Sequence, residues 1–394
     1  MLRLTWITFV LLTIVNSQLT FAHSEHDKAR FVAETGKDIG KCEQVLRPCQ
    51  TIAYAVQQAN KGDKILVAAG EYSVSSSEEL FYLKSALVPI FGGYNRFDHF
   101  QSQSPNTNPT ELKNIPVDMA EPLRQQGFVV LADGKSLFAK NSQESKTLQS
   151  KLDSYYTLSE AQSGVECADG AAGDFACNNI DLLAHMPLNA FSSRPNTAND
   201  IWGHVDLNTG DEYALIGLRN GVAVVNVTDP ENPIEVDTID GANSTWRDIK
   251  VYQYFDSSIN AWQAYAYATI DSPNNHVSII NLNQLPNSVS LTENNQEVRK
   301  AHNVYISNVD HSLNIALPGL TPSLQLIGSD KFGGAFISYS LKTPSTLTRM
   351  SNSYFGSGYT HDVHRLTLPI AEKTTSVIAK VIAALFFLTS TQEQ

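Results

Sequence analysis

A three-residue phrase recurs through the second half of the chain. Each copy joins a polar or ionisable residue to an Asp or Asn and then to a β-branched residue: Asn199-Asp200-Ile201, Arg247-Asp248-Ile249, His302-Asn303-Val304 and His361-Asp362-Val363. The middle positions, 200, 248, 303 and 362, lie 48, 55 and 59 residues apart. A repeat of this length, with β-rich runs between the copies, is typical of one four-stranded propeller blade. The phrase therefore predicts a repeat-built, mainly β fold.

The clearest repeat unit is the stretch GLRNGVAVVNVTDPENP at residues 217–233. Residues 222–227 are mostly apolar and β-branched, which suits a strand covered on both faces. Asn220-Gly221 predicts a tight hairpin entry with positive φ, and Thr228-Asp229-Pro230 predicts the turn that ends the strand. Weaker copies at 276–287 and 334–345 predict equivalent strands in successive repeats.

These stretches resemble the LVIVD-repeat proteins, and more closely the choice-of-anchor B family of bacterial secreted or surface proteins. The matching segments are 167–185, 199–203, 212–233, 244–252, 301–303 and 358–363. The resemblance implies a propeller-like extracellular domain of unassigned biochemical activity, tethered in different members by different C-terminal anchors. It supplies no catalytic residues.

The N-terminal part has a different pattern. Residues 51–60 carry apolar side chains at helical spacing, Gly62-Asp63 predicts a turn, and residues 64–68 predict a strand before the Gly-x-Tyr turn at 70–72. This order resembles the first coil of right-handed parallel β-helices of the pectin-lyase type. Only one further strand is indicated here, at 87–92, whereas a β-helix needs about three stacked coils. We therefore predict a small β-helix-like or α+β unit.

Shifts in composition divide the chain into five segments. Residues 1–22 have the positive start, apolar run and small-residue cleavage site of a secretory signal peptide. The N-terminal unit at 30–100 is followed by a linker and α/β spacer at 101–165, with a helix predicted at 119–126 and a strand at 127–132. The propeller-like repeat domain spans 166–364, and residues 365–394 form an atypical tail.

The tail leaves two alternatives open for the repeat domain. Its apolar run at 377–388 is interrupted by Lys380 and is shorter than the roughly 20 residues of a spanning helix, so we expect no stable transmembrane span. We expect a truncation or an altered reading frame near position 364. Propellers close by pairing their first and last blades, so the domain either closes or stays incomplete with exposed sheet edges.

The cysteines and the charge indicate the compartment and the partners. Cys42 with Cys49, and Cys167 with Cys177, form close pairs that we expect to be disulfides of an exported chain. The chain has 28 Lys and Arg against 40 Asp and Glu, a formal net charge of −12, which makes nucleic acid a poor partner. We expect a secreted, extracellular or cell-surface protein whose partner is an extracellular protein or a glycan.

The recurring phrase supplies the candidate binding residues. Equivalent positions of successive blades should converge on a central channel and bring together Asp200, Arg247, Asp248, His302, Asn303, His361 and Asp362. Imidazoles and carboxylates in such a group can bind a divalent cation or act as an acid–base pair. The alternative, which we favour, is that a polar residue repeated once per blade hydrogen-bonds the backbone of the next blade.

The sequence favours a non-catalytic function. It contains no nucleophile elbow, zinc-binding helix motif or phosphate loop, and we expect no cofactor. We predict a secreted or cell-surface repeat protein whose propeller presents a binding face to an extracellular macromolecule. The alternative is an extracellular polysaccharide hydrolase or lyase that uses the channel carboxylates and histidines. A third hypothesis is a module whose fold a bound cation stabilises.

Overall fold

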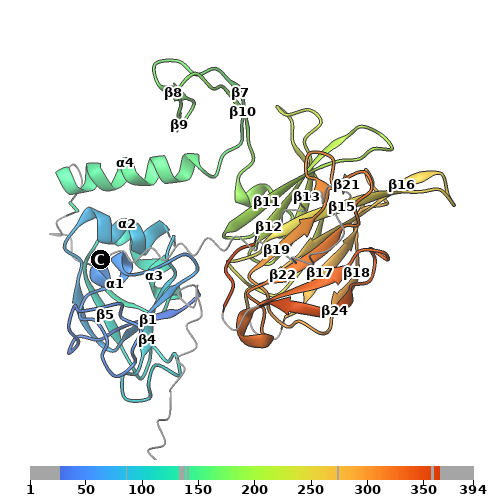
Figure 1. Ribbon diagram of the computed structural model, residues 1–394. Helices are drawn as coiled ribbons and strands as arrows, with labels where there is room; N and C mark the ends of the chain where they lie inside the picture. Colours follow the sequence, from blue (N-terminus) through green and yellow to red (C-terminus); the bar gives the residue numbers. More distant parts are fainter. Residues whose placement is uncertain are drawn as a thin grey trace, which may run out of the picture.

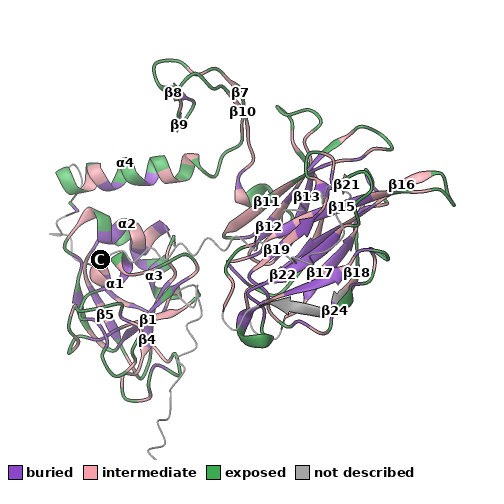
Figure 2. Cartoon of the chain, viewed as in Figure 1, coloured by how far each residue is buried: buried purple, intermediate pink, exposed green. Residues whose placement is uncertain are grey.

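The computed structural model describes residues 27–85, 87–132, 138–139, 142–272, 275–355 and 359–363. Over these residues the protein is mainly β and has two parts, one with parallel sheets and one with four-stranded antiparallel sheets (Figure 1). Buried side chains are concentrated in the strands of both parts (Figure 2). The predicted signal peptide at 1–22 and the predicted tail at 365–394 lie outside the described residues.

The N-terminal part is built from two parallel sheets that the chain visits in turn. The first contains β1 (Ala29–Val32), β2 (Lys64–Ala68) and β4 (Ile90–Tyr94), and the second contains β3 (Gly70–Ser73), β5 (Thr110–Ile115) and β6 (Val129–Ala132). The predicted strand at 64–68 is confirmed as β2. Between residues 30 and 100 the sequence indicated two strands, whereas the structure has β1 to β4. The short β1 and β3 are held by their parallel partners β2 and β5 and have no strong local signal.

Helices pack on these sheets. They are α1 (Ile52–Gln57), α2 (Ser77–Ser85), α3 (Ala120–Gln125) and α4 (Gln143–Thr157). α4 lies against α2 (Figure 1), where the rings of Tyr155 and Phe81 are 5.8 Å apart. Leu148 and Leu152 of α4 belong to the same buried cluster as the parallel strands. The segment 101–165 thus contributes β5, β6, α3 and α4 to the N-terminal core.

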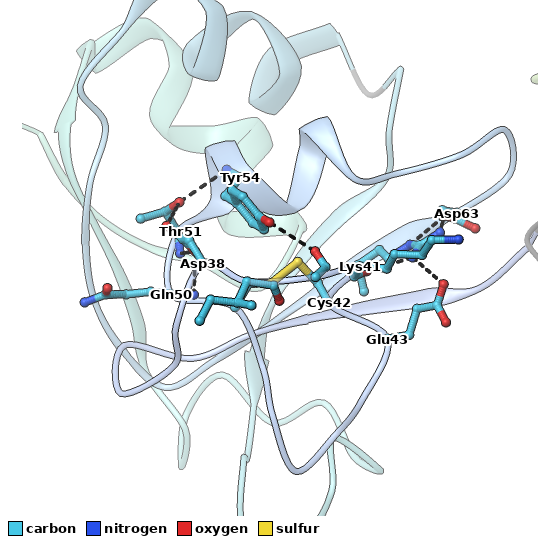
Figure 3. The surroundings of a disulfide bond; sticks show 12 residues. Asp38, Lys41, Cys42, Glu43, Gln50, Thr51, Tyr54 and Asp63 are labelled. Atoms are coloured by element: carbon cyan, nitrogen blue, oxygen red, sulfur yellow. Dashed lines mark hydrogen bonds and ion pairs between the residues drawn. A yellow bond between two sulfur atoms is a disulfide. The ribbon is translucent and has the colours of Figure 1, made fainter. Parts of the chain in front are cut away.

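The first disulfide holds the loop that leads into α1. Cys42 is bonded to Cys49, as predicted from their proximity in the sequence, and both residues are buried. Asp38 accepts a hydrogen bond from the backbone amide of Thr51 at 2.9 Å. The Thr51 hydroxyl in turn caps α1 by accepting from the Tyr54 amide at 3.2 Å (Figure 3). Loop, disulfide and helix start therefore form one unit.

A buried ion pair fixes the start of β2. Arg30 on β1 is fully buried, and its Nε donates to Asp63 Oδ2 at 2.7 Å. Asp63 also accepts from the backbone amides of Lys28 and Asn60, and Arg30 reaches the Glu43 carboxylate at 2.7 Å. Removing one partner of such a pair leaves an uncompensated buried charge, which costs about 3–5 kcal/mol.

The C-terminal part contains three four-stranded antiparallel sheets in which strand order follows chain order. The first is β11 (Ala198–Val205), β12 (Glu212–Leu218), β13 (Gly221–Asn226) and β14 (Ile234–Asp240). The second is β15 (Ile249–Asp256), β16 (Ala261–Ala268), β17 (Val277–Asn281) and β18 (Ser290–Asn295). The third is β19 (Asn303–Ser307), β22 (Ser323–Ile327), β23 (Phe336–Ser340) and β24 (Thr348–Phe355). The first strands are neighbours, β11 of β15 and β15 of β19, and the described residues contain no closed propeller.

The predicted repeat strands are the third strands of these sheets, β13, β17 and β23. In β13 the side chains of residues 222–225 are all buried, which confirms a strand covered on both faces. The prediction of positive φ at Asn220-Gly221 was wrong, since neither residue has it. Gly221 is instead confined by packing, because a Cβ there would lie 2.3 Å from the Ile239 carbonyl oxygen on β14.

The connection between the two parts includes a projecting ribbon. β7 (Gln162–Val165) pairs with β10 (Leu182–His185), and β8 (Ala171–Ala172) pairs with β9 (Phe175–Ala176). The second predicted disulfide, Cys167–Cys177, is confirmed there. In Figure 1 the ribbon extends away from the sheets. None of the helices in the described part of the chain has the length and apolar character needed to cross a membrane.

Candidate functional site

The copies of the recurring phrase lie where the first strand of each sheet begins. Asp200 is on β11, Asp248 directly precedes β15, and Asn303 opens β19. Because β11, β15 and β19 are neighbours, the structure brings these three positions to one region between the sheets. The fourth copy, His361-Asp362-Val363, lies in a described segment that follows the third sheet and contacts it.

The Asp of each of the first two copies binds the next copy along the chain. Asp200 Oδ2 accepts from the amide of Ile249 at 3.0 Å, and Asp248 Oδ2 accepts from the amide of Val304 at 2.8 Å. A carboxylate that accepts a backbone N–H across an interface forms a charge-assisted hydrogen bond. These bonds therefore join successive sheets at equivalent positions.

Two Asn side chains, at different positions of the phrase, each bind the carbonyl group of the first residue of the next copy. Asn199 Nδ2 donates to the carbonyl of Arg247 at 3.0 Å, and Asn303 Nδ2 donates to the carbonyl of His361 at 2.9 Å. The segment 359–363 thus binds the third sheet through the carbonyl of its first phrase residue, as the residue at the same position before β15 binds the first sheet. The Asp362 side chain is exposed and accepts from the neighbouring Val363 amide at 2.8 Å.

Lys250 completes a charged group between the first and second sheets. Its Nζ lies 2.5 Å from Asp248 Oδ1, 3.9 Å from Asp200 Oδ2 and 4.2 Å from the centre of the Trp202 ring. Burial raises the pKa of Asp248, the Lys250 ammonium opposes that shift, and a hydrogen bond to the Asp200 carboxyl supports it. Both carboxyl groups are therefore held by one ammonium and by backbone amides.

The Arg247 side chain binds backbone carbonyl groups. Its side chain is buried, its Nε donates to the Leu218 carbonyl at 2.8 Å, and its guanidinium also donates to the carbonyl of Ala242. Burial lowers the pKa of Arg247 to about 10. The guanidinium therefore stabilises the end of β12 and the loop before β15, away from any carboxylate of the phrase.

A second group of ionisable residues lies between the second and third sheets. The His302 ring is fully buried, stacks on Trp246 at 4.4 Å and places its Nδ1 2.9 Å from Asp271 Oδ2. Burial alone would raise the pKa of Asp271, but hydrogen bonds from His302 and Lys300 lower it. The centre of the His361 ring is 4.6 Å from that of His302. Burial lowers the pKa of His361, and the charge of the neighbouring His302 lowers it further.

Five of the seven candidate residues lie in two groups, and Arg247 and Asp362 belong to neither. Asp200 and Asp248 lie together with Lys250, whereas His302, Asn303 and His361 lie together with Asp271. Glycosidases need two carboxyl groups separated by roughly 5–10 Å across a substrate. The Lys250 ammonium lies 3.9 Å from the Asp200 carboxylate and 2.5 Å from the Asp248 carboxylate, so a bound cationic side chain and not a sugar bridges the two. No set of three His, Cys, Asp or Glu side chains in the described ranges is arranged to hold a metal ion.

Several members of these groups were not predicted from the sequence. Lys250 follows Asp248 by two residues, so the period of a strand already places both on one side. Asp271 and Lys300 lie in loops, and no local pattern relates either of them to His302.

An inserted hairpin ties the three sheets together at one end. It consists of β20 (Val309–Asp310) and β21 (Ile315–Ala316), between the first two strands of the third sheet. Its Asn314 is fully buried, accepts from Trp202 Nε1 at 2.9 Å and donates to the Gly203 carbonyl at 2.9 Å. The Asn314 carbonyl also accepts from the Gln253 amide on β15. The hairpin therefore holds β11 and β15 through a residue of the third sheet.

The three tryptophans of the described residues are half-buried and differ in their contacts. Trp202 and Trp246 donate their indole N–H groups to Asn314 and to the His302 carbonyl, so both serve contacts between sheets. Trp262 instead lies on the hairpin of β15 and β16, where it meets Phe255 at 5.6 Å. Exposed and half-buried residues cover this projecting hairpin (Figure 2).

A surface depression of about 520 Å³ lies beside the outer strand of the first sheet. Its carboxylates are engaged in local hydrogen bonds: Asp229 accepts from Asn232 Nδ2 at 2.8 Å, and Glu235 accepts from Ser192 Oγ at 2.7 Å. The depression therefore offers no free acid and base at this position.

Comparisons of the chain with known protein families and with curated proteins found no match. The geometry of the described residues therefore carries the functional argument.

Proposed function

We propose that this chain is a secreted or cell-surface, non-catalytic repeat protein of the LVIVD, choice-of-anchor B kind. Its three sheets belong to a propeller-like domain, and its N-terminal parallel sheets form a β-helix-like unit. The repeats present a binding face to an extracellular macromolecule. The observation that carries this proposal is the engagement of Asp200 and Asp248 in bonds between sheets.

The hairpin of β15 and β16 is the binding face that the exposure pattern supports best. Phe255 and Ile259 are 48% and 57% exposed, and Trp262 packs beside Phe255. Asn208 from the β11–β12 turn accepts from the Trp262 amide at 2.8 Å and donates to its carbonyl at 3.0 Å. The exposed Phe255 ring thus lies beside a half-buried Trp262 whose backbone Asn208 holds, and a preorganised aromatic surface of this kind suits a binding hot spot.

Affinity electrophoresis in gels that contain a neutral polysaccharide tests this function. Xylan, a β-glucan and a galactomannan are suitable probes because the chain carries a net charge of −12, which disfavours acidic polymers. We expect retardation by at least one polymer, without release of reducing ends. The double variant Phe255→Ser/Ile259→Ser should lose the retardation, because it removes exposed apolar area at the hairpin tip.

The matched control is Leu87→Ser/Phe97→Ser, which removes two exposed apolar side chains from the N-terminal part. The control should be retarded like the wild type. Release of reducing ends that disappears in Asp248→Asn would favour the hydrolase or lyase and contradict the proposal. Absence of retardation by every polymer would contradict a glycan as the partner.

A further inference from the structure

The ribbon of β7 and β10 is an unpartnered β structure. Among the described residues these two strands pair only with each other, so neither outer edge is covered by a third strand. A two-stranded ribbon is at best marginally stable in water by itself. An open strand edge is also a template for pairing with another chain.

The ribbon is nevertheless held in one conformation. The Cys167–Cys177 disulfide closes its tip, and Asp181 Oδ1 accepts from the Cys167 amide at 2.8 Å. Gln162 Nε2 donates to Asp174 Oδ2 at 2.6 Å and so joins the tip to β7. Such preorganisation reduces the conformational entropy that is lost on binding.

Large apolar side chains are exposed on this ribbon. Ile180, two residues before β10 begins, is 74% exposed, and Leu183 on β10 is 49% exposed. The β7–β10 ribbon projects away from the two cores (Figure 1). These two side chains therefore provide apolar contacts that nothing in the described structure uses.

The charge of the ribbon selects the kind of partner. Residues 160–185 contain five carboxylates, Glu160, Glu166, Asp169, Asp174 and Asp181. No Lys or Arg occurs between Lys151 and Arg194. A second copy of this chain is a poor partner because its net charge is −12, whereas a basic segment complements the ribbon.

We propose that the ribbon docks a basic, extended segment of another extracellular protein, which adds as a strand to an open edge. Main-chain hydrogen bonds supply affinity in this recognition mode, and alternate side chains supply specificity. Lys or Arg side chains of the partner meet the carboxylates, and its apolar side chains meet Ile180 and Leu183. This surface is separate from the β15–β16 hairpin, so it stands or falls independently of glycan binding there.

The experiment uses a fluorescent peptide of about eight residues with alternating Lys and Val, a length matched to short strands. Its anisotropy is measured with the purified full chain at low and at physiological salt. We expect saturable binding that weakens as salt is added, because exposed charges are screened. A Glu–Val peptide of the same length should not bind.

Two variants separate the charge from the apolar contact. Glu166→Gln/Asp169→Asn should weaken binding about tenfold and reduce its salt dependence. Ile180→Ser/Leu183→Ser should weaken binding but retain the salt dependence. Both sets of side chains are exposed, so melting temperatures should stay close to that of the wild type.

The matched control for charge is Glu78→Gln/Asp118→Asn, which removes two exposed carboxylates from the N-terminal part. Equal peptide affinity for the control and both ribbon variants would overturn the proposal. So would failure of the wild type to bind the basic peptide at low salt. Calcium chloride binding that is lost in Glu166→Gln/Asp169→Asn, without any peptide binding, would also overturn it in favour of a cation site.

Discussion

At the scale of single residues, the repeated Asp side chains act as connectors. Asp200 and Asp248 occupy equivalent positions, and each accepts an amide at the start of the following sheet's first strand. A buried N–H without a partner costs about 1–3 kcal/mol, so an Asp that satisfies it at these two positions has a structural role. The recurrence of Asp in the sequence is thus explained without catalysis.

His204 on β11 provides a test of burial through pH. It is 3% exposed, and burial lowers its pKa to about 4, against the opposing effect of Asp206. A histidine whose pKa is lowered in the folded state makes its full contribution to the free energy of unfolding above its unfolded-state pKa of about 6.5. That stability is lost as the pH falls from about 6.5 to about 4 and amounts to roughly 3 kcal/mol.

Denaturant unfolding between pH 7 and pH 4 measures this loss. In His204→Phe the free energy of unfolding should fall less over this range, because the titrating group is gone. His99→Asn replaces an exposed histidine in the N-terminal part and should keep the wild-type profile. The explanation fails if His204→Phe and the wild type lose the same free energy on acidification.

At the scale of elements, close packing between neighbouring strands decides where glycine is needed. Gly221→Ala places a Cβ 2.3 Å from the backbone oxygen of Ile239, so β13 and β14 must separate. We expect a loss of about 1–3 kcal/mol, the usual cost of overpacking. Gly203→Ala is the matched control, since no atom lies within 4 Å of its added Cβ on β11.

Chemical denaturation of the two glycine variants distinguishes them. Gly203→Ala should unfold at the same denaturant concentration as the wild type, or slightly higher, because alanine reduces the entropy of the unfolded chain. Gly221→Ala should unfold at a clearly lower concentration. Equal destabilisation of both variants would show that backbone crowding at β14 is not the reason for the glycine.

Elements with a strong local pattern were predictable from the sequence. The strand at 64–68, the helix within 51–60 and the buried strand at 222–227 each follow from apolar periodicity and turn residues. The β20–β21 hairpin and the pairing of β1 and β3 were not predictable, because each depends on partners far away in the chain. The candidate site followed the same rule: the phrase was visible, whereas Asp271 beside His302 was not.

At the scale of the whole molecule, three equivalent sheets are held by two kinds of contact. The phrase joins the starts of their first strands, and the β20–β21 hairpin holds β11 and β15 further along those strands. Both contacts involve backbone groups, so they fix the position of one sheet relative to the next. This rigidity suits a scaffold that presents loops and hairpins for binding.

Amide hydrogen exchange of single variants tests the central claim that the phrase connects successive sheets. In Asp200→Ala the Ile249 amide should exchange faster, and in Asp248→Ala the Val304 amide should do so. Loss of one buried hydrogen bond, about 1–3 kcal/mol, corresponds to roughly 5- to 150-fold faster exchange. The Ala223 amide in the middle of β13 should change much less in either variant. The account predicts this pairing of variant and amide, and unchanged exchange at both Ile249 and Val304 would contradict it.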